Sequence, residues 1–166
     1  MCQLRGAKKK HKPVWESRTR TGFLNTMKEN QTYHFSKSSK AKLETCDKLL
    51  QQIANRAIML VDFTVLCGVR DKEEQNRLFR EGKSKVAWPQ SKHNIESPDQ
   101  LSKAFDIAPY PIEWKDKGRF FFLAGVIKGT AAQLGIKIRW GGDWDSDNDF
   151  EDQNFDDLVH FELVEE

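Results

Sequence analysis

The sequence predicts a single α+β domain with a mostly antiparallel sheet flanked by helices. The chain has 166 residues, enough for one domain with a real core but too few for two comfortable ones. A hydrophobic content of 38%, with eleven Phe and five Trp, is typical of a globular chain. Candidate helices and strands follow one another without a repeating strand–helix–strand rhythm, which favours an antiparallel sheet over a parallel one.

Residues 1–35 are basic and polar and lack apolar periodicity, so we expect an unstructured tail before a domain over residues 36–166. Residues 1–26 carry seven Lys or Arg and one acid, a charge of +6, which leaves −4 for the remainder of a chain of net charge +2. A mildly acidic domain is not typical of nucleic-acid binding. Met27 directly precedes the patterned part, and we hypothesise that it is the natural start.

The N-terminus has charge but no apolar segment after it, so we expect no secretory signal, and no stretch is long enough to cross a membrane. The cysteines are odd in number and form no CxxC pair: Cys2, Cys46 and Cys67. This pattern indicates free thiols and synthesis in a reducing compartment.

The first predicted helix spans about residues 39–58. Its apolar residues recur at steps of three and four and form one stripe: Leu43, Cys46, Leu49, Leu50, Ile53, Ala54 and Ala57. The residues around its start offer side chains that can cap its first turn: Ser36, Ser38 and Ser39.

Short apolar runs predict strands in the rest of the chain, and longer periodic segments predict helices. In chain order these are a strand over residues 62–67, a helix over Lys72–Arg80, a strand over Ala104–Ala108, a helix over residues 118–134, a strand over Ile136–Trp140 and a strand over Leu158–Val164. An acidic loop that contains glycine joins the last two strands.

Asp106 and His160 each lie inside an apolar strand. A charged carboxylate is costly to bury unless it is paired, hydrogen-bonded or bound to metal. Because strand side chains alternate, Val159, Phe161 and Leu163 should face one way, and His160 and Glu162 the other, toward a cleft. His93 follows a polar loop, and two histidines with one carboxylate suffice for an open zinc site. A satisfied core histidine is the alternative for His160.

A hydrolase also needs a base that takes a proton from water. Asp157 stands three residues before His160 and is the candidate, with loop solvation as the alternative.

Three segments together resemble the zinc peptidases of the D-alanyl-D-alanine carboxypeptidase and dipeptidase superfamily, and most closely the phage L-alanyl-D-glutamate endopeptidases. They are Ser91-Lys92-His93, Ala104-Phe105-Asp106-Ile107-Ala108-Pro109 and Asp157-Leu158-Val159-His160-Phe161. Further matches are Gly68-Val69-Arg70, Glu74-Gln75 and Arg139-Trp140-Gly141-Gly142-Asp143-Trp144. The resemblance spans residues 38–164 and implies a Hedgehog/DD-peptidase-like fold with the zinc cleft on one sheet face.

The resemblance implies one catalytic zinc ion on His93, Asp106 and His160, with Asp157 as general base. It places Arg70 where a cation supports the developing oxyanion; an ordinary salt bridge is the alternative. Weaker candidates for substrate binding are Ser91, Gln75 and Trp144.

His93 and Asp106 are 13 positions apart, farther than the matching pair of the family. The additional residues around 96–100 indicate a loop insertion, which costs little closure entropy. The acidic loop alternates like the first half of a calcium loop, through Asp143, Asp145, Asp147 and Asp149. Asn148 could take its left-handed turn, and a regulatory Ca²⁺ ion and a merely solvated loop both remain open.

The resemblance implies a monomeric endolysin that hydrolyses the L-alanyl-D-glutamate bond of peptidoglycan. Such a protein is made in the host cytoplasm and depends on a holin-type permeabiliser to reach the cell wall. Two alternatives stay open: a D-alanyl-D-alanine carboxypeptidase or dipeptidase with the same zinc chemistry, and a zinc-stabilised wall-binding module without turnover.

Overall fold

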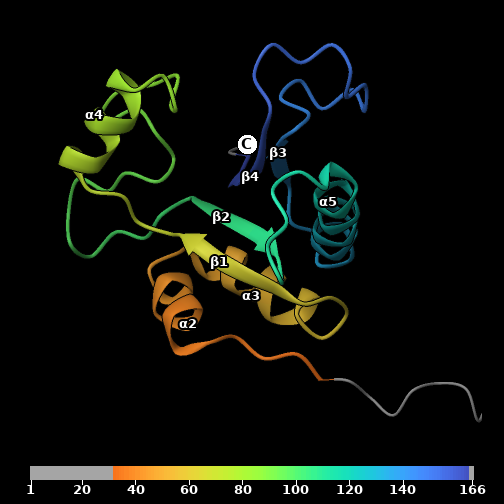
Figure 1. The fold of residues 1–166 in the computed structure, drawn as a ribbon. Helices are drawn as coiled ribbons and strands as arrows, with labels where there is room; N and C mark the ends of the chain where they lie inside the picture. The colour runs from red at the N-terminus through yellow and green to blue at the C-terminus, as the bar shows by residue number, and fades with distance from the viewer. Residues whose placement is uncertain (1–31, 165–166) are drawn as a thin grey trace, which may run out of the picture. The chain divides into compact units, whose positions relative to one another are not determined.

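The computed structural model describes residues 32–164, whose path is shown in Figure 1. The elements are α2 (Lys37–Glu44), α3 (Lys48–Ala57), β1 (Phe63–Cys67), α4 (Lys72–Arg80), β2 (Ala104–Pro109), α5 (Lys117–Gln133), β3 (Ile138–Gly141) and β4 (Asp157–Leu163). The predicted α+β class is confirmed. The proposed start at Met27 and most of the predicted tail lie outside the described residues.

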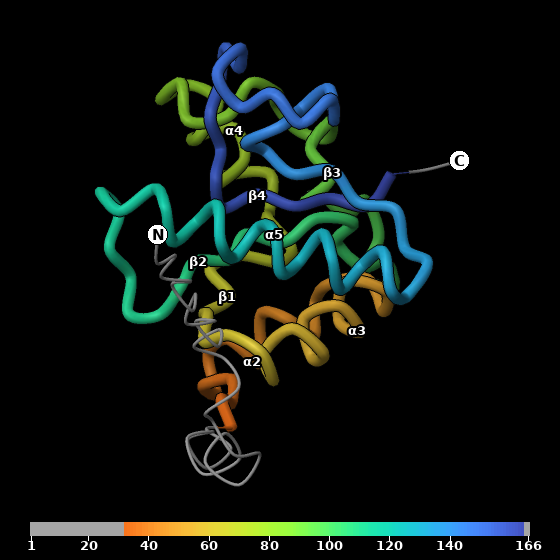
Figure 2. Tube along the Cα trace, turned by 90° about the vertical axis from the view of Figure 1, so that its right-hand side faces the viewer, coloured from red at the N-terminus to blue at the C-terminus, as the bar shows by residue number. Residues whose placement is uncertain are grey.

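The four strands form one sheet in the order β1-β2-β4-β3, and every neighbouring pair is antiparallel. Helix α5 packs along β2, β4 and β3, and α3 packs against α5, as Figure 2 shows from the side. On this face Phe105, Ile107 and Phe161 are fully buried together with Leu123 and Ile127 of α5. The helices therefore close one face of the sheet, and side chains at the alternate positions are directed to the other face.

The predicted single helix over residues 39–58 is wrong, because two helices, α2 and α3, occupy that stretch. The Thr45 hydroxyl donates to the carbonyl of Lys42 at 2.7 Å and ends α2. Asp47 then caps α3 by accepting from the Leu49 amide at 2.8 Å. Between the helices, the Asp47 amide donates to the Ser102 carbonyl at 2.8 Å, so the break is held by a residue far along the chain.

A bulge interrupts the pairing of β3 with β4. Trp140 pairs with Phe161, but the next residue, Gly141, pairs with Asp157. The predicted alternation therefore fails at Val159, which lines the cleft, whereas Phe161 and Leu163 enter the core. In a regular strand Asp157 would face away from a residue three positions later. Because of the bulge, Asp157 and His160 line the same cleft.

The packed part of the chain begins before residue 36. Tyr33 and Phe35 both pack against the core, and the rings of Phe35 and Phe63 meet edge to face at 5.2 Å. Within residues 32–164, no helix combines the length and the apolar character that a membrane crossing requires.

Gly68 lies where the chain leaving β1 passes against the end of α2. A Cβ atom there would lie 2.5 Å from the Lys42 carbonyl and would clash with the Thr45 hydroxyl. We expect Gly68→Ala to lower the free energy of unfolding by about 1–3 kcal/mol, because backbone has to move. Gly125, inside α5 with open space at its Cβ position, is the matched control, and Gly125→Ala should raise it by about 0.5–1 kcal/mol. Urea unfolding of both variants measures the difference, and equal stabilities would contradict the close approach.

Candidate metal centre

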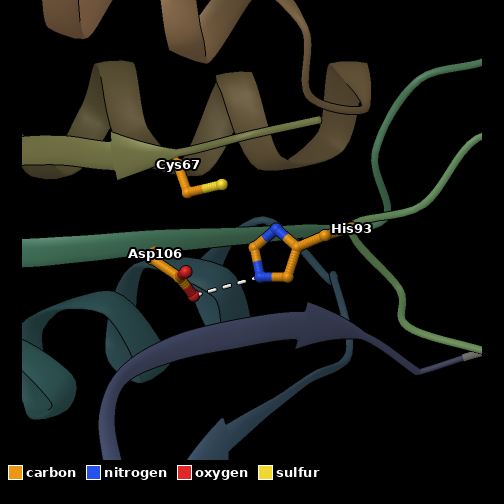
Figure 3. A group of neighbouring side chains, drawn as sticks. All are labelled: Cys67, His93 and Asp106. Carbon is orange, nitrogen blue, oxygen red and sulfur yellow. Dashed lines mark hydrogen bonds and ion pairs between the residues drawn. The ribbon is translucent and has the colours of Figure 1, made fainter. Parts of the chain in front are cut away.

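The register of the sheet brings the candidate ligands together. Asp106 of β2 pairs directly with His160 of β4, and on its other side with Cys67 of β1. His93 comes from the loop before β2. Its carbonyl accepts from the Arg70 amide at 3.0 Å, and its Nδ1 lies 2.7 Å from the Gly68 carbonyl oxygen. Figure 3 shows the ring of His93 directed at Asp106, with Cys67 near the same ring.

The loop between His93 and Asp106 is closed at its base. The Lys103 amide donates to the Lys92 carbonyl at 2.9 Å, and the Ser102 hydroxyl lies 3.3 Å from the same oxygen. Residues 94–101 thus begin and end at neighbouring points. The long spacing in sequence does not separate His93 from Asp106 in space.

Three polar atoms converge at one point. His93 Nε2, His160 Nδ1 and Asp106 Oδ1 are each 3.1 Å from the other two. All three residues are buried, with exposed fractions of 1%, 7% and 8%. Burial at these separations means that the three atoms share one small space that water does not reach freely.

The outer partners of both rings set their tautomers. A carbonyl and a carboxylate only accept, so His93 donates from Nδ1 to Gly68, and His160 donates from Nε2 to Glu162 at 3.0 Å. In the neutral rings, the inner nitrogens then present lone pairs. Two nitrogen lone pairs and one carboxylate oxygen meet without a proton between them, an arrangement that requires a cation.

The set fits zinc. Ligands of a tetrahedral Zn²⁺ ion, about 2.0–2.2 Å from the metal, are roughly 3.3–3.6 Å apart, close to the separations found here. Cys67 Sγ also lies within 4.8 Å of ligand atoms of His93 and Asp106. Its thiol is oriented toward the carbonyls of Gly68 and Val69, at 3.6 and 4.0 Å. His160 Nδ1 lies 3.1 Å from both His93 Nε2 and Asp106 Oδ1 and completes the closer triangle.

The pKa values of His93 and Asp106 also show that the centre favours positive charge. Burial disfavours the imidazolium of His93, but Asp106 outweighs it and raises the pKa of His93 to about 10. Burial also opposes ionisation of Asp106, yet the two histidines hold its pKa well below the usual range. Without a metal, protons on the imidazoles supply the charge that the centre needs.

Arg70 contacts the outer oxygen of Asp106. Its Nη2 donates to Oδ2 at 2.9 Å, and its Nη1 donates to Gln75 Oε1 at 3.1 Å. Gln75 is fully buried, and its Nε2 donates to the Ser84 hydroxyl and to the Val86 carbonyl. Arg70 lines the cleft, whereas Gln75 holds Arg70 from behind and is absent from the cleft lining.

The centre opens into a cleft of about 770 Å³, which Ser91, Trp144 and Asp157 also line. The Ser91 hydroxyl accepts from the His93 amide at 3.3 Å. Burial raises the pKa of Asp157, and the negative charge of Asp106 raises it further. A half-buried carboxylate with a raised pKa beside a cation site has the properties of a general base.

A family model described as phage L-alanyl-D-glutamate peptidase matches residues 31–164, which include every residue of the site. The chain belongs to the phage L-alanyl-D-glutamate peptidase family. The L-alanyl-D-glutamate peptidase of Escherichia phage T5 is 31% identical over 141 residues, 80% of this chain and 99% of the relative. The L-Ala D-Glu endopeptidase ChiX of Serratia marcescens shares the fold, with a TM-score of 0.64 at 24% identity, over 81% of this chain and 92% of that one.

In this peptidase the acidic loop gathers three of its four predicted residues. Carboxylate oxygens of Asp143, Asp145 and Asp147 lie within 4.8 Å of one another, whereas Asp149 is absent from that group and accepts from the Glu151 amide. Asn148 has a φ of 70°, the left-handed turn expected there. Lys128 of α5 donates to Asp143 Oδ2 at 2.9 Å, so an ammonium already contacts the cluster.

The sequence pattern did not single out two residues that support the centre: Glu162, which contacts His160, and Arg139, which contacts Glu162. Glu162 accepts from His160, and Arg139 donates to Glu162. The available signal was the two-residue spacing from His160, which places Glu162 on the same face of β4.

The metal-free peptidase should lose stability as the pH rises from neutral. The pKa of His93 is about 10 in the fold and 6.5 ordinarily, so its contribution is complete below pH 6.5 and declines as the pH approaches 10. Urea midpoints in EDTA should therefore fall between pH 6.5 and 9. His93→Gln should flatten this slope, and His34→Gln, at an exposed site, should retain it. Equal slopes in all three proteins would contradict the charged pair.

Proposed function

We propose that the protein is a zinc-dependent peptidoglycan hydrolase that cleaves the L-alanyl-D-glutamate bond of stem peptides. His93, Asp106 and His160 hold the ion. The observation that carries the proposal is the convergence of three buried electron-pair donors at 3.1 Å, inside a cleft that also contains a carboxylate with a raised pKa. Membership of the phage L-alanyl-D-glutamate peptidase family supports the choice of bond.

The residues of the cleft have separate tasks. A bound zinc ion supplies Lewis acidity, which polarises a carbonyl and acidifies water. The Asp157 carboxylate takes a proton from the attacking water and returns it to the leaving amine. The Arg70 guanidinium, held by Gln75 and Asp106, keeps further N–H groups for the oxygen that becomes negative in the tetrahedral intermediate.

Ser91 and Trp144 are proposed to contact the substrate at the cleft wall, where both lie. In the cell, we propose that the protein is made in the host cytoplasm as a monomer. It acts as an endolysin on the cell wall after a holin-type partner has permeabilised the membrane. The phage family supports this setting.

Digestion of purified sacculi tests the bond and the base together. Mass spectrometry should find new N-terminal D-glutamate on stem peptides, with L-alanine left on the sugar. Asp157→Asn should lower kcat by at least about 100-fold, because the proton acceptor is lost. Metal analysis should find one zinc ion per chain in both proteins.

Other outcomes select the alternatives. Release of terminal D-alanine with L-Ala-D-Glu bonds intact would establish a carboxypeptidase. Binding to sacculi without new termini, unchanged in Asp157→Asn, would establish a wall-binding module. A wild-type protein that hydrolyses sacculi fully after exhaustive chelation would remove zinc from the mechanism.

We also propose that the acidic loop binds Ca²⁺ and that the ion regulates the peptidase. Three carboxylates in reach of one another and the left-handed Asn148 support a calcium loop. Calorimetry on the zinc-loaded protein should show Ca²⁺ binding that is lost in the double variant Asp145→Asn, Asp147→Asn. Asp99→Asn, in the loop after His93, should bind as the wild type does. Absence of binding heat and of Trp144-sensitised Tb³⁺ emission in the wild type would refute the calcium loop.

A further inference from the structure

Glu162 and Trp144 contact His160 on the sides that do not face the metal centre, and Arg139 contacts both of them. We propose that Glu162, Arg139 and Trp144 form a positioning collar, which fixes the tautomer and ring plane of His160 so that Nδ1 is the metal-binding atom. The role of the collar in metal binding rests on the proposed function. Its effect on the tautomer and ring plane of His160 does not depend on metal.

Glu162 sets the tautomer. Its Oε2 lies 3.0 Å from His160 Nε2, and Glu162 is itself buried, with an exposed fraction of 6%. A carboxylate only accepts, so the ring proton resides on Nε2 and the lone pair on Nδ1. The tautomer of His93 is set in the same way by a different acceptor, since the Gly68 carbonyl accepts from His93 Nδ1.

Arg139 holds Glu162. The two residues are direct cross-strand partners of β3 and β4, and the Arg139 Nε donates to Glu162 Oε1 at 3.1 Å. A second guanidinium N–H reaches the same oxygen. Oε1 is thus occupied by Arg139, which leaves Oε2 for His160. A charge-assisted pair of this kind orients a buried carboxylate that would otherwise be free to rotate.

Trp144 sets the ring plane. Its indole stacks on His160 with ring centres 5.4 Å apart and planes 29° apart. The indole is fixed in turn, because its Nε1 donates to the Phe155 carbonyl at 2.7 Å. The Arg139 guanidinium lies 5.4 Å from the Trp144 ring centre.

The contacts close on themselves, from His160 to Glu162, Arg139, Trp144 and back to His160. Every link is between side chains whose backbones belong to β3, β4 or the residues just after β3. The collar is therefore built from adjoining strands of the sheet and from the residues that follow β3. Removal of one member frees His160 to exchange its tautomer or to turn its ring, and the inner nitrogen is then presented only part of the time.

Ring ¹⁵N NMR of the metal-free protein, with zinc affinity by chelator competition, tests the collar. At a pH high enough for the His160 ring to be neutral, the wild type should show His160 as the Nε2–H tautomer. Glu162→Ala should give a tautomer mixture and weaken zinc binding about 10- to 100-fold. Glu162→Gln keeps an oxygen that accepts and should retain most of the tautomer. Glu74→Ala, which removes an exposed partner of Arg77, is the matched control and should change neither reading.

An unchanged His160 spectrum with zinc affinity within twofold of wild type in Glu162→Ala would overturn the proposal. If Glu162→Ala does not fold, Arg139→Ala replaces it, and the same null result there overturns the proposal. A protein that binds no zinc would refute the proposed function. The NMR test of the His160 tautomer would still decide the collar, because it needs neither metal nor substrate.

Discussion

Asp106 is an ionised carboxylate inside a four-stranded sheet, and much of the structure compensates for its burial. Arg70 neutralises one oxygen, while two imidazoles approach the other. Removal of Arg70 or of the imidazoles would leave the buried negative charge of Asp106 without part of its compensation. The same arrangement that makes Asp106 tolerable also concentrates electron pairs at one point, so the stability of the fold and the affinity for a cation are two aspects of one electrostatic problem.

The register of the sheet places the partners of Asp106 beside its carboxylate. Asp106 and His160 meet because β2 and β4 pair residue against residue, and a shift of β4 by one position would turn His160 into the core. The bulge opposite Gly141 adds a second device, because it directs Asp157 to the cleft despite an odd spacing. Gly141 suits this position, since a Cβ atom there would clash with the Asp157 carbonyl. Asp157 and His160, from one strand, thereby line one cleft.

Sequence reasoning located the charged residues in apolar strands, because the free energy of burial makes such residues conspicuous. It also placed Glu162 on the face of His160, since that follows from local alternation. It failed where the outcome depends on distant partners. The break between α2 and α3 depends on Ser102, and the orientation of Val159 depends on how β3 pairs with β4. The contact of Arg70 with Asp106 and the buried position of Gln75 likewise required the assembled fold.

The loop over residues 94–101 begins beside His93 and ends beside Lys103, and the backbone hydrogen bond from Lys103 to Lys92 closes its base. Its length is therefore uncoupled from the geometry of the metal centre. Chain can be added at its tip for a small entropic penalty, since closure entropy rises only slowly with length. The loop is a natural graft point, where a short affinity peptide could direct the peptidase to a chosen cell surface while the catalytic cleft keeps its shape.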